Sequence, residues 1–186
     1  MLAEFTEVVR IAVFVSTLGS VSIKDRLSSL YVRWYGMKRG REEFAKAKRG
    51  IYPISVLYMD LDGFKEVNDT YGHSVGDKVL ERVGSIIQRS IRYMDVPFRY
   101  GGDEFVVILP ATSLSNAQEV ASRIINVVHE FFKEYPYDIS ISIGVASYPD
   151  DEVNSFEELL SIADKRLYQA KRMGKNRFYT RGDGES

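Results

Sequence analysis

Three acidic side chains stand where they could hold a metal ion. Asp60 ends a run of apolar residues, and Asp103 and Glu104 follow a pair of glycines between two further apolar runs. If these runs are neighbouring strands, the carboxylates meet at one edge of a sheet. Mg²⁺ and Mn²⁺ prefer such oxygen ligands, and Mg²⁺ usually combines one or two carboxylates with substrate phosphates. Two ions can then activate an attacking hydroxyl and stabilise a leaving oxygen. Alternatively, Asp60 and Asp62 are solvated turn residues and Asp103 is a turn former.

Two groups of residues near these carboxylates could bind phosphate. Gly63, Phe64 and Lys65 follow the first carboxylate and lead toward a helix. Backbone N–H groups in such a turn can hold phosphate oxygens. Lys171 and Lys175 lie in and after the last turn of a later predicted helix. They could clamp the outer phosphates of a nucleotide or complement the dipole at the helix C-terminus, and the two roles are compatible.

An amide and a carboxylate beyond the first phosphate-binding turn could recognise a base. Asn68 and Asp77 flank the segment that follows the turn. Such a pair can hydrogen-bond the edge of guanine selectively. Both residue types also cap helices, which is the alternative role. His73 and His129 lack the spacing of metal ligands, and His73 is expected to be structural.

The periodicity of apolar residues predicts the elements that position these side chains. Near-continuous apolar runs and strict alternation indicate strands, and apolar residues three and four apart indicate helices. The predicted strands are Pro53–Asp60, Val96–Tyr100, Glu104–Leu109, Tyr137–Tyr148 and Arg177–Thr180. The predicted helices are Lys38–Gly50, Ser74–Arg92, Leu114–Tyr135 and Phe156–Met173. Gly101 and Gly102 predict a tight hairpin turn, because such turns need positive φ.

This order of elements is β-α-β-β-α-β with one further helix and strand. It predicts an α+β fold with a ferredoxin-like core, in which helices flank one face of an antiparallel sheet. A length of 186 residues fits one such domain plus an N-terminal extension. The uncharged stretch from Ile11 to Ile23 is too short to span a bilayer, which needs about 20 residues. It is expected to pack against another part of the protein.

Bulk composition excludes several function classes. The net charge of -1 gives no global positive field for nucleic acid or an anionic membrane. The chain has no cysteine, so disulfides and thiolate metal or redox sites are excluded. A small anionic ligand could still bind at a local cluster of basic side chains.

Four segments of the chain, in order, resemble the GGDEF family of diguanylate cyclases. They are Arg99–Phe105 (RYGGDEF), Asp60–Asp77, Ile141–Ala146 and Ala163–Asn176. The resemblance implies a cyclase domain over residues 25–180 and a fold similar to nucleotidyl cyclases and polymerase palms. Residues 1–24 would be an N-terminal helix or linker and a candidate dimer contact, and residues 181–186 a flexible tail.

The resemblance also implies a reaction and roles for individual residues. The enzyme would condense two GTP molecules into cyclic di-GMP and release two diphosphates, with two Mg²⁺ or Mn²⁺ ions in each active site. The metal ligands would be Asp60, the Leu61 carbonyl, Asp103 and Glu104, and one of the last two would also assist deprotonation of the attacking hydroxyl. The nucleotide would be bound by Gly63, Phe64, Lys65, Asn68, Asp77, Gly102, Lys171 and Lys175. Because each domain binds one GTP, the active form would be a homodimer.

A separate tetrapeptide resembles the Arg-x-x-Asp product-inhibition site of this family. Arg92 is expected to end a helix, with Asp95 in the turn that follows and Arg123 as a further contact from the next helix. A guanidinium group suits both phosphate and the Hoogsteen edge of guanine. The alternative is an ordinary ion pair at a helix end, worth about 0–1 kcal/mol.

The sequence departs from the family at three places. Ser29 stands where these enzymes usually carry glycine, Val32 where they carry asparagine, and Lys175 where arginine is frequent. The first two concern the start of the domain and leave the metal and guanine positions untouched. Lys175 keeps the charge but loses the forked geometry of arginine.

Two rival functions fit the same fold. One is a catalytically silent domain that senses GTP or cyclic di-GMP, and the other is a structural interaction module whose acidic cluster binds no metal. The resemblance implies a cytoplasmic location, and the natural chain could continue upstream into a sensory region or a membrane tether. No nucleic-acid partner is expected.

Overall fold

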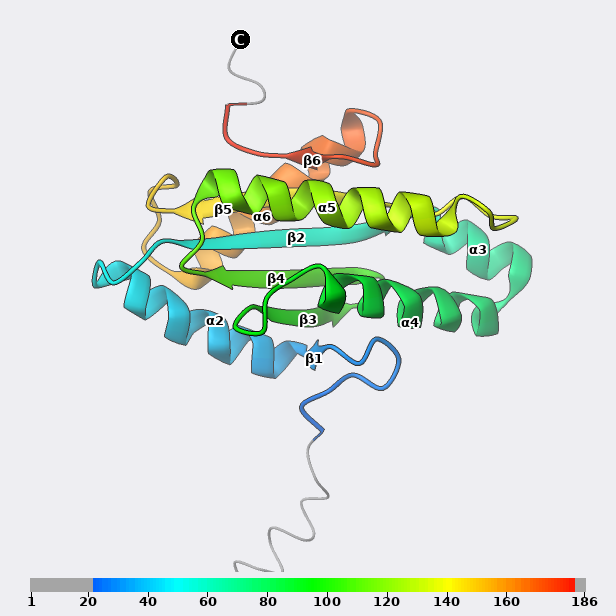
Figure 1. Ribbon diagram of the computed structural model, residues 1–186, viewed down its shortest axis with the longest axis horizontal. Coiled ribbons are helices and arrows are strands. Elements are labelled where there is room, and N and C mark those ends of the chain that lie inside the picture. The colour runs from blue at the N-terminus through cyan, green and yellow to red at the C-terminus, as the bar shows by residue number, and fades with distance from the viewer. Residues whose placement is uncertain (1–21, 183–186) are drawn as a thin grey trace, which may run out of the picture.

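A computed structural model describes residues 22–182 as a six-stranded sheet with helices on both sides. The strands are β1 (Tyr31–Val32), β2 (Ile54–Asp62), β3 (Val96–Gly101), β4 (Glu104–Pro110), β5 (Ser140–Tyr148) and β6 (Phe178–Tyr179). The helices are α2 (Arg33–Lys48), α3 (Phe64–Tyr71), α4 (His73–Arg89), α5 (Leu114–Phe132) and α6 (Phe156–Arg172). The strand order is β1-β3-β4-β2-β5-β6 (Figure 1).

The four central strands form the predicted antiparallel core. β3, β4, β2 and β5 pair antiparallel in that order, which is the ferredoxin-like arrangement. The two short edge strands add parallel pairs, β1 with β3 and β5 with β6, so the complete sheet is mixed. The predicted fold class is therefore confirmed, with two edge pairings that the order of elements did not specify.

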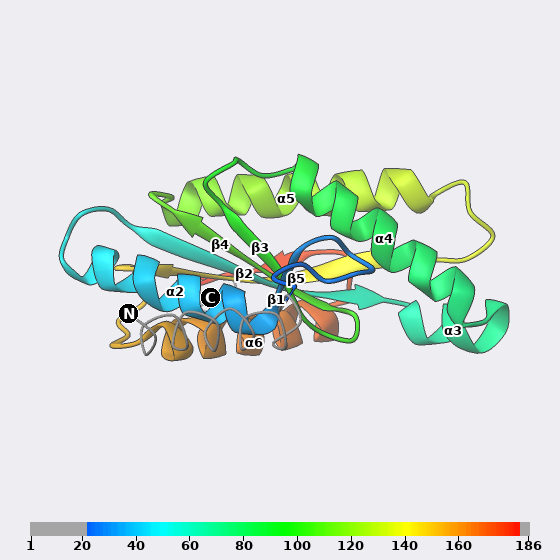
Figure 2. The ribbon, with the colours of Figure 1, turned by 90° about the horizontal axis from the view of Figure 1, so that it is seen from below.

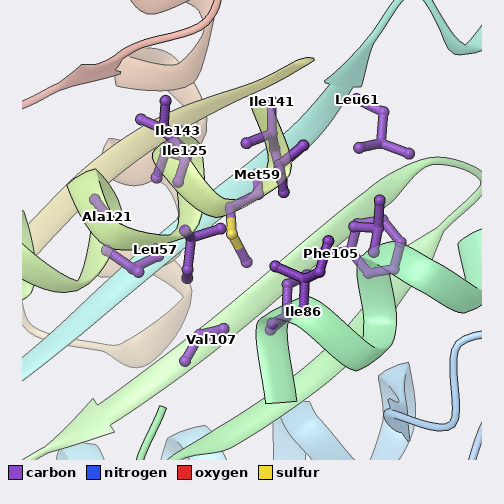
Figure 3. Packing of buried hydrophobic residues seen from close by; sticks show 14 of the residues in the cluster. Leu57, Met59, Leu61, Ile86, Phe105, Val107, Ala121, Ile125, Ile141 and Ile143 are labelled. Carbon is purple, nitrogen blue, oxygen red and sulfur yellow. The ribbon is translucent and has the colours of Figure 1, made fainter. Parts of the chain in front are cut away.

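The sheet is covered on both faces, as Figure 2 shows. Leu57 and Met59 of β2 pack in one core with α4 and α5 (Figure 3), and Val56 and Tyr58 pack in a second core with α2 and α6. The expectation of helices on one face holds for the two helices of the β-α-β-β-α-β unit. It is wrong for the whole domain, because α2 and α6 fill the other face. Burial of both faces explains why β2 reads as a nearly continuous apolar run.

Several boundaries differ from those predicted. α2 begins at Arg33 rather than Lys38, and β2 continues to Asp62 because Asp62 pairs with Ser140 of β5. The structure also contains α3, an eight-residue helix that the periodicity did not predict. Its only buried residue is Val67, so it carries too short an apolar stripe to be recognised.

The N-terminal connector, residues 22–32, leads into α2. Lys24 bridges to Tyr31, and the Asp25 carboxylate accepts hydrogen bonds from the backbone N–H and the hydroxyl of Ser28, both at 2.8 Å. The stretch from Ile11 to Ile23 and the tail at 181–186 lie largely outside the described residues. None of the helices between residues 22 and 182 has the length and apolar character needed to cross a membrane.

Candidate active site

The ends of β2 and β4 bring the three predicted carboxylates together. Asp60 lies directly opposite Glu104 in the antiparallel register. The Leu61 N–H donates to the Asp103 carbonyl at 3.3 Å, which fixes the hairpin turn against the end of β2. Gly102 has φ 51°, the conformation expected of a tight turn. The predicted meeting of Asp60, Asp103 and Glu104 at one sheet edge is what the fold produces.

The electrostatics of this edge show an excess of negative charge, which Lys171 offsets only in part. Burial raises the pKa of Asp60 to about 6, and the charges of Asp103 and Glu104 also raise it, against the opposing effect of Lys171. Burial likewise raises the pKa of Glu104, followed by the charges of Asp164 and Asp103. Like charges in partly buried positions are costly unless a cation neutralises them.

This donor set fits Mg²⁺ or Mn²⁺ bound together with substrate. Within residues 22–182, no three Asp, Glu, His or Cys side chains form a ready metal cage. Two facing carboxylates are nevertheless what Mg²⁺ uses when phosphates supply its other ligands. The alternative that Asp60 is a solvated turn residue is wrong, because its side chain is only 15% exposed and Asp60 belongs to β2.

Lys171 of α6 contacts the sheet edge that carries Asp60, Asp103 and Glu104, here called the carboxylate edge. Its Nζ lies 2.5 Å from Asp60 Oδ1, and the side chain keeps 33% of its surface exposed. Lys171 also lies in the last turn of α6, so the dipole role and the site role coincide. Lys175 lies apart from this pair, in a turn beyond α6 where it adopts φ 61°.

The turn after β2 contains Gly63, Phe64 and Lys65, the first of the two groups predicted to contact phosphate. Gly63 precedes α3 with φ 81°, and a Cβ at this position would lie 2.3 Å from the Asp138 carbonyl oxygen. Only glycine fits there without displacing backbone. Phe64 packs on the core, whereas Lys65 is exposed. Gly63 and Lys175 share the wall of a 570 Å³ cavity that Asp60 and Glu104 do not line.

Asn68 and Asp77 lie on either side of the α3–α4 junction. The Asn68 side-chain oxygen lies 2.0 Å from the position that a Cβ on Gly76 would occupy, so Asn68 packs against the residue next to Asp77. Neither residue is a helix cap: the N-cap positions of α3 and α4 are Gly63 and Gly72, and neither helix has a side-chain cap. The capping alternative is wrong for both. The exposed His73 opens α4.

The Arg92–Asp95 turn is a compact unit at a second location. The Arg92 N–H donates to Asp95 Oδ2 at 2.7 Å, and the Asp95 N–H donates to the Arg92 carbonyl at 3.1 Å. Arg92 is exposed, while Asp95 is 6% exposed. α4 ends at Arg89, so the expectation that Arg92 ends the helix is wrong by one turn. Arg123 Nε and Nη2 donate to the Ser90 carbonyl beside the turn.

The turn is not the ion pair that the alternative supposed. Among the described residues, Asp95 is bound through the backbone of Arg92, and no side-chain bridge joins the two. Burial raises the pKa of Asp95, and the Arg92 N–H and the charges of Arg92 and Arg123 oppose that effect. The guanidinium of Arg92 is thus left available to a ligand.

Comparison with known proteins decides the family. The family described as "Diguanylate cyclase, GGDEF domain" matches residues 22–177. The chain belongs to the GGDEF family. It is 47% identical to diguanylate cyclase A of Treponema denticola over 129 residues, covering 67% of this chain and 34% of that protein. It is 39% identical to diguanylate cyclase DosC of Escherichia coli over 160 residues, covering 82% and 34%. The chain thus spans about a third of the length of these relatives.

Solved GGDEF structures share the fold. The GGDEF domain of DgcB from Caulobacter crescentus, in complex with c-di-GMP, superposes with a TM-score of 0.78 at 30% identity, covering 86% of this chain and 95% of that one. The active GGEEF domain of a Vibrio cholerae diguanylate cyclase gives a TM-score of 0.72 at 32% identity, covering 80% and 96%.

Two departures from the GGDEF pattern have visible structural consequences. Ser29 adopts φ 60°, the left-handed conformation that glycine would adopt without strain. Val32 is the residue before α2, and it supplies no side-chain cap, whereas asparagine is among the best caps. Both departures weaken the connector locally and leave the carboxylate edge intact.

Sequence reasoning missed two side chains beside Glu104. The Tyr58 hydroxyl lies 3.5 Å from Glu104 Oε1, and the charge of Asp164 on α6 raises the pKa of Glu104. Spacing could have indicated both. Tyr58 is two residues before Asp60 on the same strand face, and Asp164 is two helical turns before Lys171 on the same helix face.

Proposed function

We propose that the chain is a diguanylate cyclase domain that condenses two GTP molecules into cyclic di-GMP and releases two diphosphates. The observation that carries the proposal is the pairing of Asp60 with Glu104 at a negatively charged, partly buried edge within the GGDEF signature. That edge is suited to bind a cation together with a triphosphate.

The metal ligands proposed are Asp60, the Leu61 carbonyl, Asp103 and Glu104. Two Mg²⁺ or Mn²⁺ ions bound there would offset phosphate charge and lower the pKa of the attacking 3′-hydroxyl. Either Asp103 or Glu104 would receive the proton from that hydroxyl.

The other site residues bind and orient the nucleotide. Lys65, Lys171 and Lys175 supply positive charge to the phosphates, together with the backbone of Gly63 and Phe64. Asn68 and Asp77 bind the guanine edge from the α3–α4 junction. A Cβ built on Gly102 meets no atom within 4 Å, so the space above the hairpin is open to the nucleotide.

Catalysis requires two copies of this site. One GTP per domain means that two active faces meet, and a two-fold arrangement places each 3′-hydroxyl near the α-phosphate of the other nucleotide. The stretch from Ile11 to Ile23 is the candidate dimer contact. Specific activity should rise with enzyme concentration, and deleting residues 1–23 should lower it at high dilution. Unchanged sedimentation and rate after the deletion would remove that role.

Incubation with GTP and Mg²⁺, followed by chromatography for cyclic di-GMP, tests the function. Accumulation of cyclic di-GMP supports a cyclase. GTP binding without product would indicate a silent sensor domain, and the absence of both binding and product would indicate a structural module.

Product inhibition at Arg92, Asp95 and Arg123 is the second part of the proposal. The exposed Arg92 guanidinium beside a buried, backbone-held carboxylate supports it, and the DgcB domain is a relative in complex with c-di-GMP. Binding there would act through domain placement at a distance from the active site. Arg92→Ala should weaken cyclic di-GMP binding and let product accumulate further, with little change in initial rate. Equal slowing of both proteins by added product would exclude Arg92.

A further inference from the structure

We infer that Tyr58 is a positioning residue that orients the Glu104 carboxylate for metal binding, an inference that rests on the proposed function. Tyr58 lies on β2 two residues before Asp60, so both side chains project from the same sheet face. Its hydroxyl lies 3.5 Å from Glu104 Oε1. Tyr58 is 5% exposed, which removes water as a competing partner on most sides.

The chemistry of this pair makes Tyr58 a donor. A phenol carries one O–H donor and an ionised carboxylate only acceptors, so the Tyr58 hydroxyl donates to Glu104. A formed hydroxyl–carboxylate hydrogen bond measures about 2.5–3.0 Å, so the present contact is long. Contacts of this kind commonly tighten when the substrate complex forms.

The Tyr58 ring is fixed by a stack that reaches the start of α2. The Tyr100 ring packs on it with centroids 5.2 Å apart at 54°. The Arg33 guanidinium lies 3.9 Å above the Tyr100 ring, and Arg33 Nη2 donates to the Tyr100 hydroxyl at 2.7 Å. Aromatic and cation–π contacts of this geometry hold a ring in place beyond what burial alone does. The hydroxyl therefore approaches Glu104 from a supported position.

Glu104 is the carboxylate that needs such support. The Asp60 carboxylate is bound by the Lys171 ammonium, whereas the side-chain hydrogen bond to the Glu104 carboxylate comes from Tyr58. A hydrogen bond from Tyr58 limits the rotation of the Glu104 carboxylate and keeps it directed toward the sheet edge that it shares with Asp60. Outer partners of metal ligands act in this way, and their loss typically costs about 10–100-fold in metal affinity or activity.

The test compares Tyr58→Phe with Tyr148→Phe. Phenylalanine keeps the ring stack and removes only the hydroxyl. Tyr148 is a matched control, because it lies at the opposite end of the sheet, paired with Ile54, and its ring packs on Phe44. Mn²⁺ affinity is measured by the electron paramagnetic resonance of free Mn²⁺ in the presence of 3′-deoxy-GTP, which lacks the attacking hydroxyl.

Tyr58→Phe is expected to weaken Mn²⁺ binding about tenfold and to raise the Mg²⁺ concentration for half-maximal rate similarly. The KM for GTP at saturating Mg²⁺ should change less than about twofold, and Tyr148→Phe should match wild type. Wild-type Mn²⁺ affinity in Tyr58→Phe, or an equal loss in Tyr148→Phe, would overturn the positioning role. Glu104→Gln separates the two proposals: if it also binds Mn²⁺ like wild type, the proposed metal site fails; if it loses Mn²⁺ while Tyr58→Phe does not, only the inference about Tyr58 fails.

Discussion

The carboxylate edge and the N-terminal connector shift the pKa of an aspartate in opposite directions. At the edge, burial raises the pKa of Asp60 to about 6, and neighbouring carboxylates add to the effect. In the connector, burial would also raise the pKa of Asp25, but hydrogen bonds from Ser28 and the charge of Arg99 outweigh it and lower the pKa. Ionisation therefore destabilises the fold at Asp60 and stabilises it at Asp25.

The two regions meet at the hairpin. Arg99 Nη1 lies 3.2 Å from Asp25 Oδ1, and Arg99 Nε and Nη2 donate to the Gly102 carbonyl at 2.9 and 2.7 Å. The ion pair between Asp25 and Arg99 thus links the connector to the turn that carries Asp103 and Glu104. A domain can keep repelling charges at a binding edge when paired charges nearby fix the backbone that carries them.

The largest expected effect is on turnover at the carboxylate edge. Glu104→Gln removes one charge that must offset phosphate repulsion through bound metal, and cyclic di-GMP formation should fall by about 100-fold or more. The free energy of unfolding should stay level or rise, because a source of repulsion is lost. Product chromatography and urea titration measure the two effects. Glu157→Gln, at an exposed pair with Arg41, is the control that should keep activity.

The same change in the connector should act on stability instead. Asp25→Asn weakens the bond to Arg99 and the hydrogen bonds from Ser28, and the free energy of unfolding should fall by about 1–3 kcal/mol. Urea titration checks this, with Asp150→Asn at an exposed turn as control. Equal stability of Asp25→Asn and wild type would erase the contrast between the two regions.

The sequence specified the core sheet because each signal was local. The continuous apolar run of β2 indicated a buried central strand, and the paired glycines indicated a hairpin. The apolar run did not indicate that α2 and α6 cover a second face, because their position depends on tertiary packing. Gly36 of α2 lies against Phe98, and Gly40 of α2 lies against Phe156 of α6. Nor could the sequence reveal α3, whose polar surface leaves almost no periodic signal.

The sequence predicted which motifs form the candidate site, but not which side chains contact one another within it. Asp60 and Glu104 were expected to meet, and the strand register makes them direct neighbours. The contact of Tyr58 with Glu104 depends on that register, which no local pattern fixes. The prediction that Arg92 ends α4 was wrong. The helix ends at Arg89, where the Ser90 N–H donates to the Ile86 and Ile87 carbonyls, and no glycine in the sequence marks that end.

Opposite pH dependence should sharpen the comparison. Asp60 has a folded pKa of about 6 against an ordinary value of 3.8, so the folded state holds its proton longer than the unfolded chain. Wild type should therefore lose stability relative to Asp60→Asn as pH rises through about 6, by about 1–2 kcal/mol. Asp25 should behave in reverse: its contribution is present above its ordinary pKa and is lost as pH falls through the lowered folded value. Urea midpoints of wild type, Asp60→Asn and Asp25→Asn from about pH 2 to pH 8 measure both differences. Parallel slopes would contradict the contrast.

The smallest effect concerns strain within the connector. Ser29 is exposed and holds φ 60°, which costs an L-residue about 1–2 kcal/mol, while its N–H donates to the Asp25 carbonyl at 2.9 Å. Ser29→Gly removes the strain and keeps that hydrogen bond. Glycine also raises the conformational entropy of the unfolded chain, which cancels part of the stabilisation. The free energy of unfolding should rise by about 0.5–1 kcal/mol, with no change in initial rate. Ser29→Ala keeps the Cβ and the strain, so it should not stabilise. If alanine stabilises as much as glycine, the left-handed conformation at residue 29 is not the source of the effect.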